Sequence, residues 1–140
     1  MSTKQNKTIV CRIPEELFSQ GNLAVADEVF APDFVGHRQL PPEWPQGVAR
    51  VKQFVTHLRS AFPDFSYTIE DMMAEDDKVT VRMTASGTHQ GIFMGIAATG
   101  KKATWPEIHI CRLQDDFVVE HWIQSDQVGM LQQLGVISGN

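Results

Sequence analysis

The sequence has few cysteines, little positive charge and no long apolar run, and each shortage excludes a class of protein. Its 140 residues include only Cys11 and Cys111, which are too few and too far apart for a disulfide framework or a four-ligand zinc site. No apolar run approaches the ~20 residues of a membrane-spanning helix. Seventeen Asp and Glu outnumber 12 Lys and Arg, so the net charge is -5, whereas nucleic-acid binding calls for a basic stripe. We therefore expect neither a membrane nor a nucleic acid as a partner.

The remaining composition is typical of one globular domain. Apolar residues make up 42% and charged residues 21%, which is enough to bury a core and argues against wholesale disorder. Residues 1–7 are polar and lack the apolar segment of a signal peptide. We expect a cytoplasmic, single-domain protein over residues 1–140, with residues 1–6 flexible.

Helical patterns occupy the first half of the chain. Apolar residues recur at helical spacing over residues 8–20, although Pro14 either kinks this helix or delays its start to Glu15. Asn22 can cap a short second helix that runs to Phe30. After a proline-rich loop over residues 37–46, an apolar stripe predicts a third helix over residues 48–62, which Pro63 ends.

Strand patterns occupy most of the second half. Apolar and polar residues alternate over residues 65–74, 79–86, 102–113 and 117–125, with a glycine-rich excursion over residues 87–100. A short helical turn over residues 128–134 follows. Because helices and strands are segregated along the chain, the pattern predicts an α+β fold rather than alternating βαβ units.

The last predicted hairpin places chemically active side chains on one face of the sheet. If Asp115 and Asp116 form a two-residue turn, Gln114 pairs with Phe117, and side chains alternate from there. One face then carries Trp105, Glu107, His109, Trp122, Gln124 and Asp126, and His121 points away. Tryptophans mixed with carboxylates, an imidazole and an amide indicate a pocket lining. A bulge in either strand would divide this set between the two faces.

The earlier hairpin presents a second charged pair. With a four-residue turn at residues 75–78, Ala74 pairs with Val79 and Asp71 faces Arg82. This pair is either a cross-strand ion pair that contributes little to stability or a source of positive charge in the pocket. The sequence leaves both interpretations open.

Three segments of the chain together resemble one family, the SnoaL-like polyketide cyclases, also called ester cyclases. They are FAPDFVGH at residues 30–37, GTHQGIFMGI and TGKK within residues 87–102, and a final pattern of Trp122, Asp126, Gly129, Leu131 and QLG at residues 133–135. The resemblance implies a nuclear transport factor 2-like fold, in which a curved antiparallel sheet wraps around N-terminal helices to form a cone with a deep pocket. It also implies a homodimer or tetramer packed through the sheet.

The resemblance further implies an activity. The founding cyclases close a polyketide ring by intramolecular aldol condensation without a metal or cofactor, using an essential aspartate and a pocket histidine. These roles map to Asp126 as the acid/base and His109 as its partner, and a polar pocket position maps to His37. We therefore expect no cofactor, no metal, and a small hydrophobic or aromatic ligand.

The expected chemistry is the removal of a proton next to a carbonyl group. It needs a carboxylate whose pKa an apolar pocket raises, and a donor to the enolate oxygen, such as a histidine or Arg82. The residues expected to contact the substrate are His37, Arg82, Phe93, Trp105, Glu107, Trp122 and Gln124. Trp105 and Trp122 would stack on a planar or ring-shaped substrate.

Simpler roles compete with these expectations. Asp126 is also a suitable cap for the C-terminal helical turn, His109 could be a hydrogen-bonded core residue, and His89 is more typical of a structural role. His37, His89 and His109 lack the short spacing of a metal site. The same fold also hosts non-catalytic carrier domains. Epoxide hydrolysis, which needs two carboxylates joined by an arginine, fits the residue order poorly.

Overall fold

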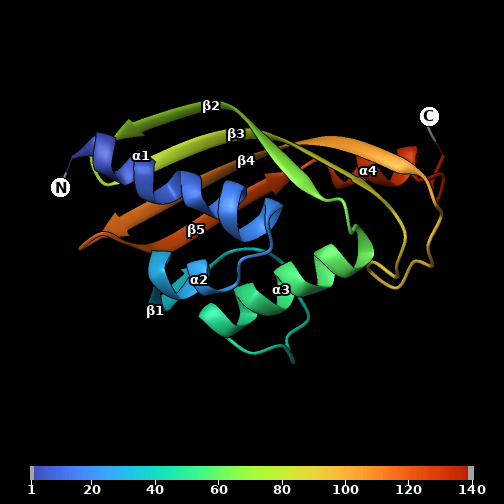
Figure 1. The fold of residues 1–140 in the computed structure, drawn as a ribbon, viewed down its shortest axis with the longest axis horizontal. Helices are drawn as coiled ribbons and strands as arrows, with labels where there is room; N and C mark the ends of the chain where they lie inside the picture. Colours follow the sequence, from blue (N-terminus) through green and yellow to red (C-terminus); the bar gives the residue numbers. More distant parts are fainter. Residues whose placement is uncertain (1, 139–140) are drawn as a thin grey trace.

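Five strands form one curved sheet, and helices from the first half of the chain lie against one of its faces (Figure 1). The computed structural model describes residues 2–138. The helices are α1 (Thr3–Arg12), the π-helix η1 (Ile13–Ser19), α2 (Ala24–Val29), α3 (Val48–Ala61) and α4 (Gln127–Gln133). The strands are β1 (Phe30–Gly36), β2 (Ser66–Glu75), β3 (Lys78–Thr88), β4 (Lys102–Gln114) and β5 (Phe117–Ser125). This arrangement confirms the predicted α+β fold with a curved sheet around N-terminal helices.

The first helix is longer than predicted. It begins at Thr3, where the Ser2 hydroxyl caps the chain by accepting a hydrogen bond from the Gln5 amide, and its first turns include residues 3–6. Pro14 does not delay the start, because the chain continues without a break from α1 into η1. The wider π-helical turn keeps Leu17 and Phe18 buried in the core. Within residues 2–138 no helix has the length and apolar character needed to cross a membrane.

Strand β1 is the element that the sequence does not predict. It lies at the edge of the sheet and runs parallel to β5, whereas the other neighbouring strands are antiparallel in the order β1-β5-β4-β3-β2. Pro32 is tolerated there because an edge strand leaves one side of its backbone unpaired. This strand carries the chain from α2 to the loop that enters the site.

The register of the β2–β3 hairpin is as predicted. Ala74 lies opposite Val79, and Asp71 lies opposite Arg82. The Arg82 guanidinium donates to the Asp71 carboxylate at 2.6 Å, and both side chains are more than half exposed. The structure therefore contains the cross-strand ion pair.

The register of the β4–β5 hairpin differs from the prediction by one residue. Gln114 pairs with Phe117 as expected, but one extra residue in β5 shifts the pairing so that Arg112 faces Glu120 and Glu107 faces Ser125. The predicted pairing of Glu107 with Gln124, and of the other residues beyond the bulge, is therefore wrong. Because side chains alternate along a strand, the bulge exchanges the faces of all the following β5 residues.

Two methionines on adjacent strands test which side of the sheet holds the core. Met83 on β3 is 1% exposed, whereas Met73 on β2 is 63% exposed. We expect Met83→Ala to lower the free energy of unfolding by about 2–5 kcal/mol because it leaves a cavity. Met73→Ala should stay within about 0.5 kcal/mol of wild type. Urea denaturation of both variants measures this, and equal losses would contradict the described packing.

Candidate active site

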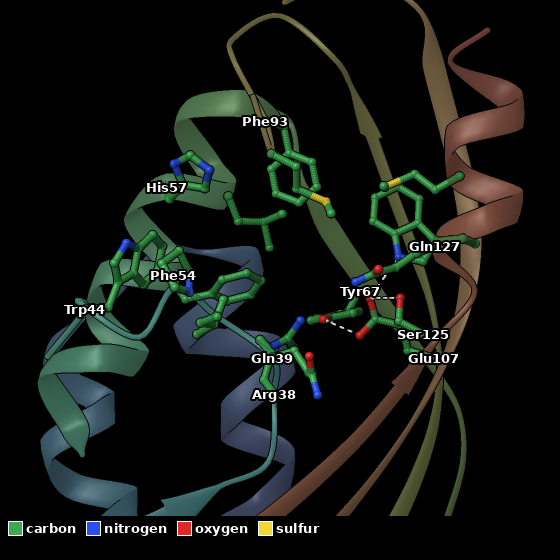
Figure 2. Close-up of a pocket in the computed structure, with 16 residues that line it drawn as sticks. Arg38, Gln39, Trp44, Phe54, His57, Tyr67, Phe93, Glu107, Ser125 and Gln127 are labelled. Atoms are coloured by element: carbon green, nitrogen blue, oxygen red, sulfur yellow. Dashed lines mark hydrogen bonds between the residues drawn. The ribbon is translucent and has the colours of Figure 1, made fainter. Parts of the chain in front are cut away.

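A cavity of about 400 Å³ lies between the sheet and α3 (Figure 2). Its helix-side wall consists of Trp44, Phe54, His57 and Leu58, and its sheet-side wall contains Tyr67, Trp105, Glu107 and Ser125. Phe93 and Met94, from the glycine-rich excursion, also line it. Most of this surface is apolar, and the charged side chains gather at one end, a combination typical of small-molecule sites.

A buried carboxylate organises the polar end of the cavity. Glu107 is 4% exposed and accepts hydrogen bonds from the Tyr67 hydroxyl at 2.7 Å, Trp105 Nε1 at 2.8 Å and His109 Nε2 at 2.8 Å. The Ser125 hydroxyl lies at 3.3 Å and donates a fourth, longer hydrogen bond. A carboxylate accepts about four hydrogen bonds, so the acceptor capacity of Glu107 is filled.

These partners decide the charge of Glu107. Burial raises the pKa of the carboxyl, but the hydrogen bond from His109, the charge that His109 acquires when it is protonated in acid, the positive charge of Arg38 and the Tyr67 hydroxyl together lower it to about 2. Burial also raises the pKa of Tyr67 well above its ordinary value. At neutral pH the cavity therefore holds an ionised carboxylate beside a protonated phenol.

Two buried histidines extend this network away from the cavity. His109 and His121 are 2% and 6% exposed, and His109 Nδ1 lies 3.0 Å from His121 Nε2. Burial lowers the pKa of both, so both are neutral at neutral pH. Because ionised Glu107 can only accept, the network implies that His109 carries its proton on Nε2 and that His121 donates from its own Nε2. The prediction that His121 points away from this face is wrong, as the bulge in β5 turns it inward.

Arg38 is a cavity residue that sequence reasoning missed. Its guanidinium carbon lies 4.0 Å from the centroid of the Phe54 ring. Its Nη2 atom is buried and has no hydrogen-bond partner within residues 2–138. Arg38, Leu40 and Phe54 also line a second cavity of about 50 Å³, which His121 borders, so these side chains separate the two cavities. Arg38 lies in an irregular loop, where no periodic pattern could have assigned it to a face.

Four of the predicted substrate contacts lie outside the main cavity. Trp122 and Gln124 are on the opposite face of the sheet from Glu107, because the bulge reverses their direction. His37 borders the smaller cavity, and its ring stacks on Trp122 with centroids 5.3 Å apart. Arg82 pairs with Asp71 at the surface.

The other predicted residues lie at or near the cavity. Phe93, Trp105 and Glu107 line it directly, and His109 contacts it through Glu107. Asp126 is exposed and caps α4, since its Oδ1 accepts a hydrogen bond of 2.9 Å from the Gly129 amide. Its neighbours Ser125 and Gln127 line the cavity.

Histidine placement also bears on metal binding. His89 is fully buried, stacks on Phe62, and has its Nδ1 atom 3.1 Å from the Thr99 hydroxyl, which gives it a structural environment. In the part of the chain that the structure describes, no three His, Cys, Asp or Glu side chains are grouped to hold a metal ion.

Comparison with known proteins finds relatives of this chain by sequence and by structure. A sequence profile of the SnoaL-like polyketide cyclases matches residues 8–134. Aklanonic acid methyl ester cyclase DnrD of Streptomyces peucetius is 31% identical over 83 residues, which span 58% of this chain and 57% of that cyclase. Wild-type IdmH of Streptomyces antibioticus has a similar structure (TM-score 0.80, 33% identity, 94% of this chain and 99% of that chain). TsrD of Streptomyces laurentii shares the fold, with a TM-score of 0.89 and 24% identity over 98% of this chain and 99% of that chain.

The depressed pKa of Glu107 predicts an acid-sensitive stability. A folded-state pKa of about 2, against the ordinary 4.5, stabilises the fold above about pH 4.5, and this contribution is lost as the pH falls toward 2. In Glu107→Gln the free energy of unfolding should fall less steeply between pH 4.5 and pH 2 than in wild type. At pH 7 it should be lower by about 2–4 kcal/mol, because buried donors lose a charged acceptor. Urea unfolding from pH 2 to pH 7 measures both effects.

The exposed Glu15 provides the control for this measurement. Glu15→Gln should retain the free energy of unfolding of wild type at pH 7 and should lose it in acid as steeply as wild type does. If Glu107→Gln lost stability in acid as steeply as wild type does, the ionised state of Glu107 would be refuted.

Proposed function

Because this chain belongs to the SnoaL-like polyketide cyclase family, we propose that it performs cofactor-free acid/base chemistry on a hydrophobic carbonyl compound. The reaction is an aldol-type cyclisation or an isomerisation in the 400 Å³ cavity. The observation that carries this proposal is the ionised Glu107, connected to two neutral histidines, at the polar end of an apolar cavity. A carboxylate that is held in place beside a proton donor can accept a proton during a reaction and return it.

The walls of the cavity favour a planar, ring-containing ligand. Aromatic side chains come from both sides: Trp44 and Phe54 from the helix side and Phe93 from the glycine-rich excursion (Figure 2). Trp105 on β4 contributes from the sheet side. A cavity of this volume lies within the usual range for small-molecule sites. Apolar walls also exclude water, which would otherwise compete with an enolate for hydrogen bonds.

In the proposed reaction, Tyr67 exchanges protons with the substrate. Its hydroxyl takes the proton from the carbon next to a carbonyl while passing its own proton to Glu107, and the C–H electron pair forms an enolate. The enolate carbon then bonds to a second carbonyl carbon, whose oxygen becomes an alkoxide. The same hydroxyl protonates this alkoxide and recovers its proton from Glu107, so no proton is gained or lost overall.

The low pKa of Glu107 limits this route. A carboxylate with a pKa of about 2 is a weak base, so the proton transfer becomes feasible only if the enolate itself is strongly stabilised. The resemblance instead assigns the acid/base role to Asp126, with His109 as its partner. Contacts favour Glu107, because Asp126 is exposed and caps α4 through Gly129.

A non-catalytic binding role is the second candidate. It is favoured by one observation: all four acceptor positions of Glu107 are occupied by protein donors. In this role, the carboxylate and its four donors would fix the shape of the cavity and take no part in proton transfer. The protein would then bind the same class of ligand without converting it.

Turnover of aklanonic acid methyl ester, the compound in the name of the related cyclase, tests these proposals. We expect Glu107→Gln and Tyr67→Phe each to lower kcat roughly 100-fold or more, because both remove a step of the proton route. Asp126→Asn should keep kcat within about threefold of wild type, because an Asn cap retains most of its stabilising effect. Product formation followed by mass spectrometry measures kcat.

The alternatives predict different patterns in the same experiment. A loss of turnover in Asp126→Asn, with full activity in Glu107→Gln, would support the assignment from the resemblance. Binding of the ester by all variants without conversion by wild type would support the carrier role. Glu15→Gln, which alters an exposed carboxylate, serves as the control and should match wild type.

A further inference from the structure

The unpaired Nη2 atom of Arg38 is a feature that the proton route leaves unexplained. Buried N–H groups nearly always have a hydrogen-bond partner, and an unpaired one destabilises the fold. Arg38 Nη2 has none within residues 2–138, although its side chain lines the cavity. A ligand acceptor would satisfy it.

The guanidinium lies beside three residues of the cavity wall, Phe54, Tyr67 and Glu107. It stacks on the Phe54 ring at 4.0 Å. It also lies close enough to the other two groups for its charge to help lower the pKa of Glu107 and to oppose the rise in the pKa of Tyr67 that burial causes. It also lies in the partition between the two cavities. Figure 2 shows Arg38 at the same end of the cavity as the Tyr67 hydroxyl and Glu107. A ligand oxygen on Arg38 would therefore lie beside the group that exchanges protons.

We propose that Arg38 binds the carbonyl oxygen of a neutral ketone with an aromatic or alicyclic ring, and donates a hydrogen bond to the enolate oxygen formed from it. This inference rests on the proposed function and names its substrate class. It supplies the enolate stabilisation that a weak base requires.

Charge at the site favours a neutral ligand over an anion. The positive charge of Arg38 is already balanced by ionised Glu107, so a permanent carboxylate would add a second negative charge near Glu107. A carbonyl oxygen avoids this repulsion and gains negative charge only during the reaction. Arg82, the cation considered from the sequence, is engaged by Asp71 outside the cavity.

Three compounds of similar size test the subsite: 1-tetralone, its hydrocarbon counterpart tetralin, and the anion 1-naphthoate. Their dissociation constants are measured by NMR titration of wild type, Arg38→Met, Arg38→Lys and Arg82→Met. Wild type should bind 1-tetralone roughly tenfold or more tightly than tetralin, as expected for a hydrogen bond from a charged donor. Arg38→Met should abolish this preference without weakening tetralin binding. Arg38→Lys should restore part of it, and Arg82→Met should match wild type.

Each contrary result overturns a defined part of the proposal. Equal affinities of wild type for 1-tetralone and tetralin would refute the carbonyl subsite. Tighter binding of 1-naphthoate than of 1-tetralone would show an anion site instead. Absence of binding by both tetralin and 1-tetralone would refute the ligand class. Weaker tetralin binding in Arg38→Met would show that Arg38 only maintains the shape of the cavity.

Hydrogen–deuterium exchange at the carbon next to the carbonyl of 1-tetralone separates this inference from the proposed function. We expect wild type to accelerate the exchange in D2O, and Arg38→Met to lose most of that acceleration at saturating ligand. Arg38-dependent binding without accelerated exchange would support the subsite and refute the catalytic function. Accelerated exchange that does not depend on Arg38 would support the catalytic function and refute the role of Arg38.

Discussion

The ionised carboxylate of Glu107 is the interaction on which the site depends. Its hydrogen-bond donors come from three strands: Tyr67 from β2, Trp105 and His109 from β4, and Ser125 from β5. A buried charge is tolerated only when it is paired and fully hydrogen-bonded. The same contacts therefore keep the carboxylate ionised, link the three strands at the polar end of the cavity, and set the proton positions on the histidines.

Local patterns predicted the fold well, because its elements follow from side-chain periodicity. The stripe of α3 and the alternation in β3 and β4 are strong enough to fix helix, strand and hairpin order, and the β2–β3 register followed from one turn. Strand β1 was not predicted because it is short, contains Pro32 and pairs with β5, which is distant in the sequence. Such an edge pairing leaves no repeating pattern in its own sequence.

The site was predicted only in part, and one extra residue explains much of the difference. Glu107 and Phe93 were expected at the pocket and line the cavity, but the bulge in β5 turns Trp122 away and His121 inward. Turn length alone cannot reveal a bulge beyond the turn. Arg38 shows a different limit, since a side chain in an irregular loop is placed by tertiary packing alone.

The helix cap and the cavity are coupled through adjacent residues. Asp126 holds the start of α4, while Ser125 before it donates to Glu107 and Gln127 after it lines the cavity. An aspartate at this position can therefore affect the site without touching the ligand, because loss of the cap would loosen the segment that carries Ser125. A role in positioning and a role in proton transfer predict different effects on stability and turnover, and only proton transfer requires the carboxylate itself rather than its hydrogen bond to Gly129. Since asparagine preserves the cap and removes the charge, the amide variant separates the two roles at this position.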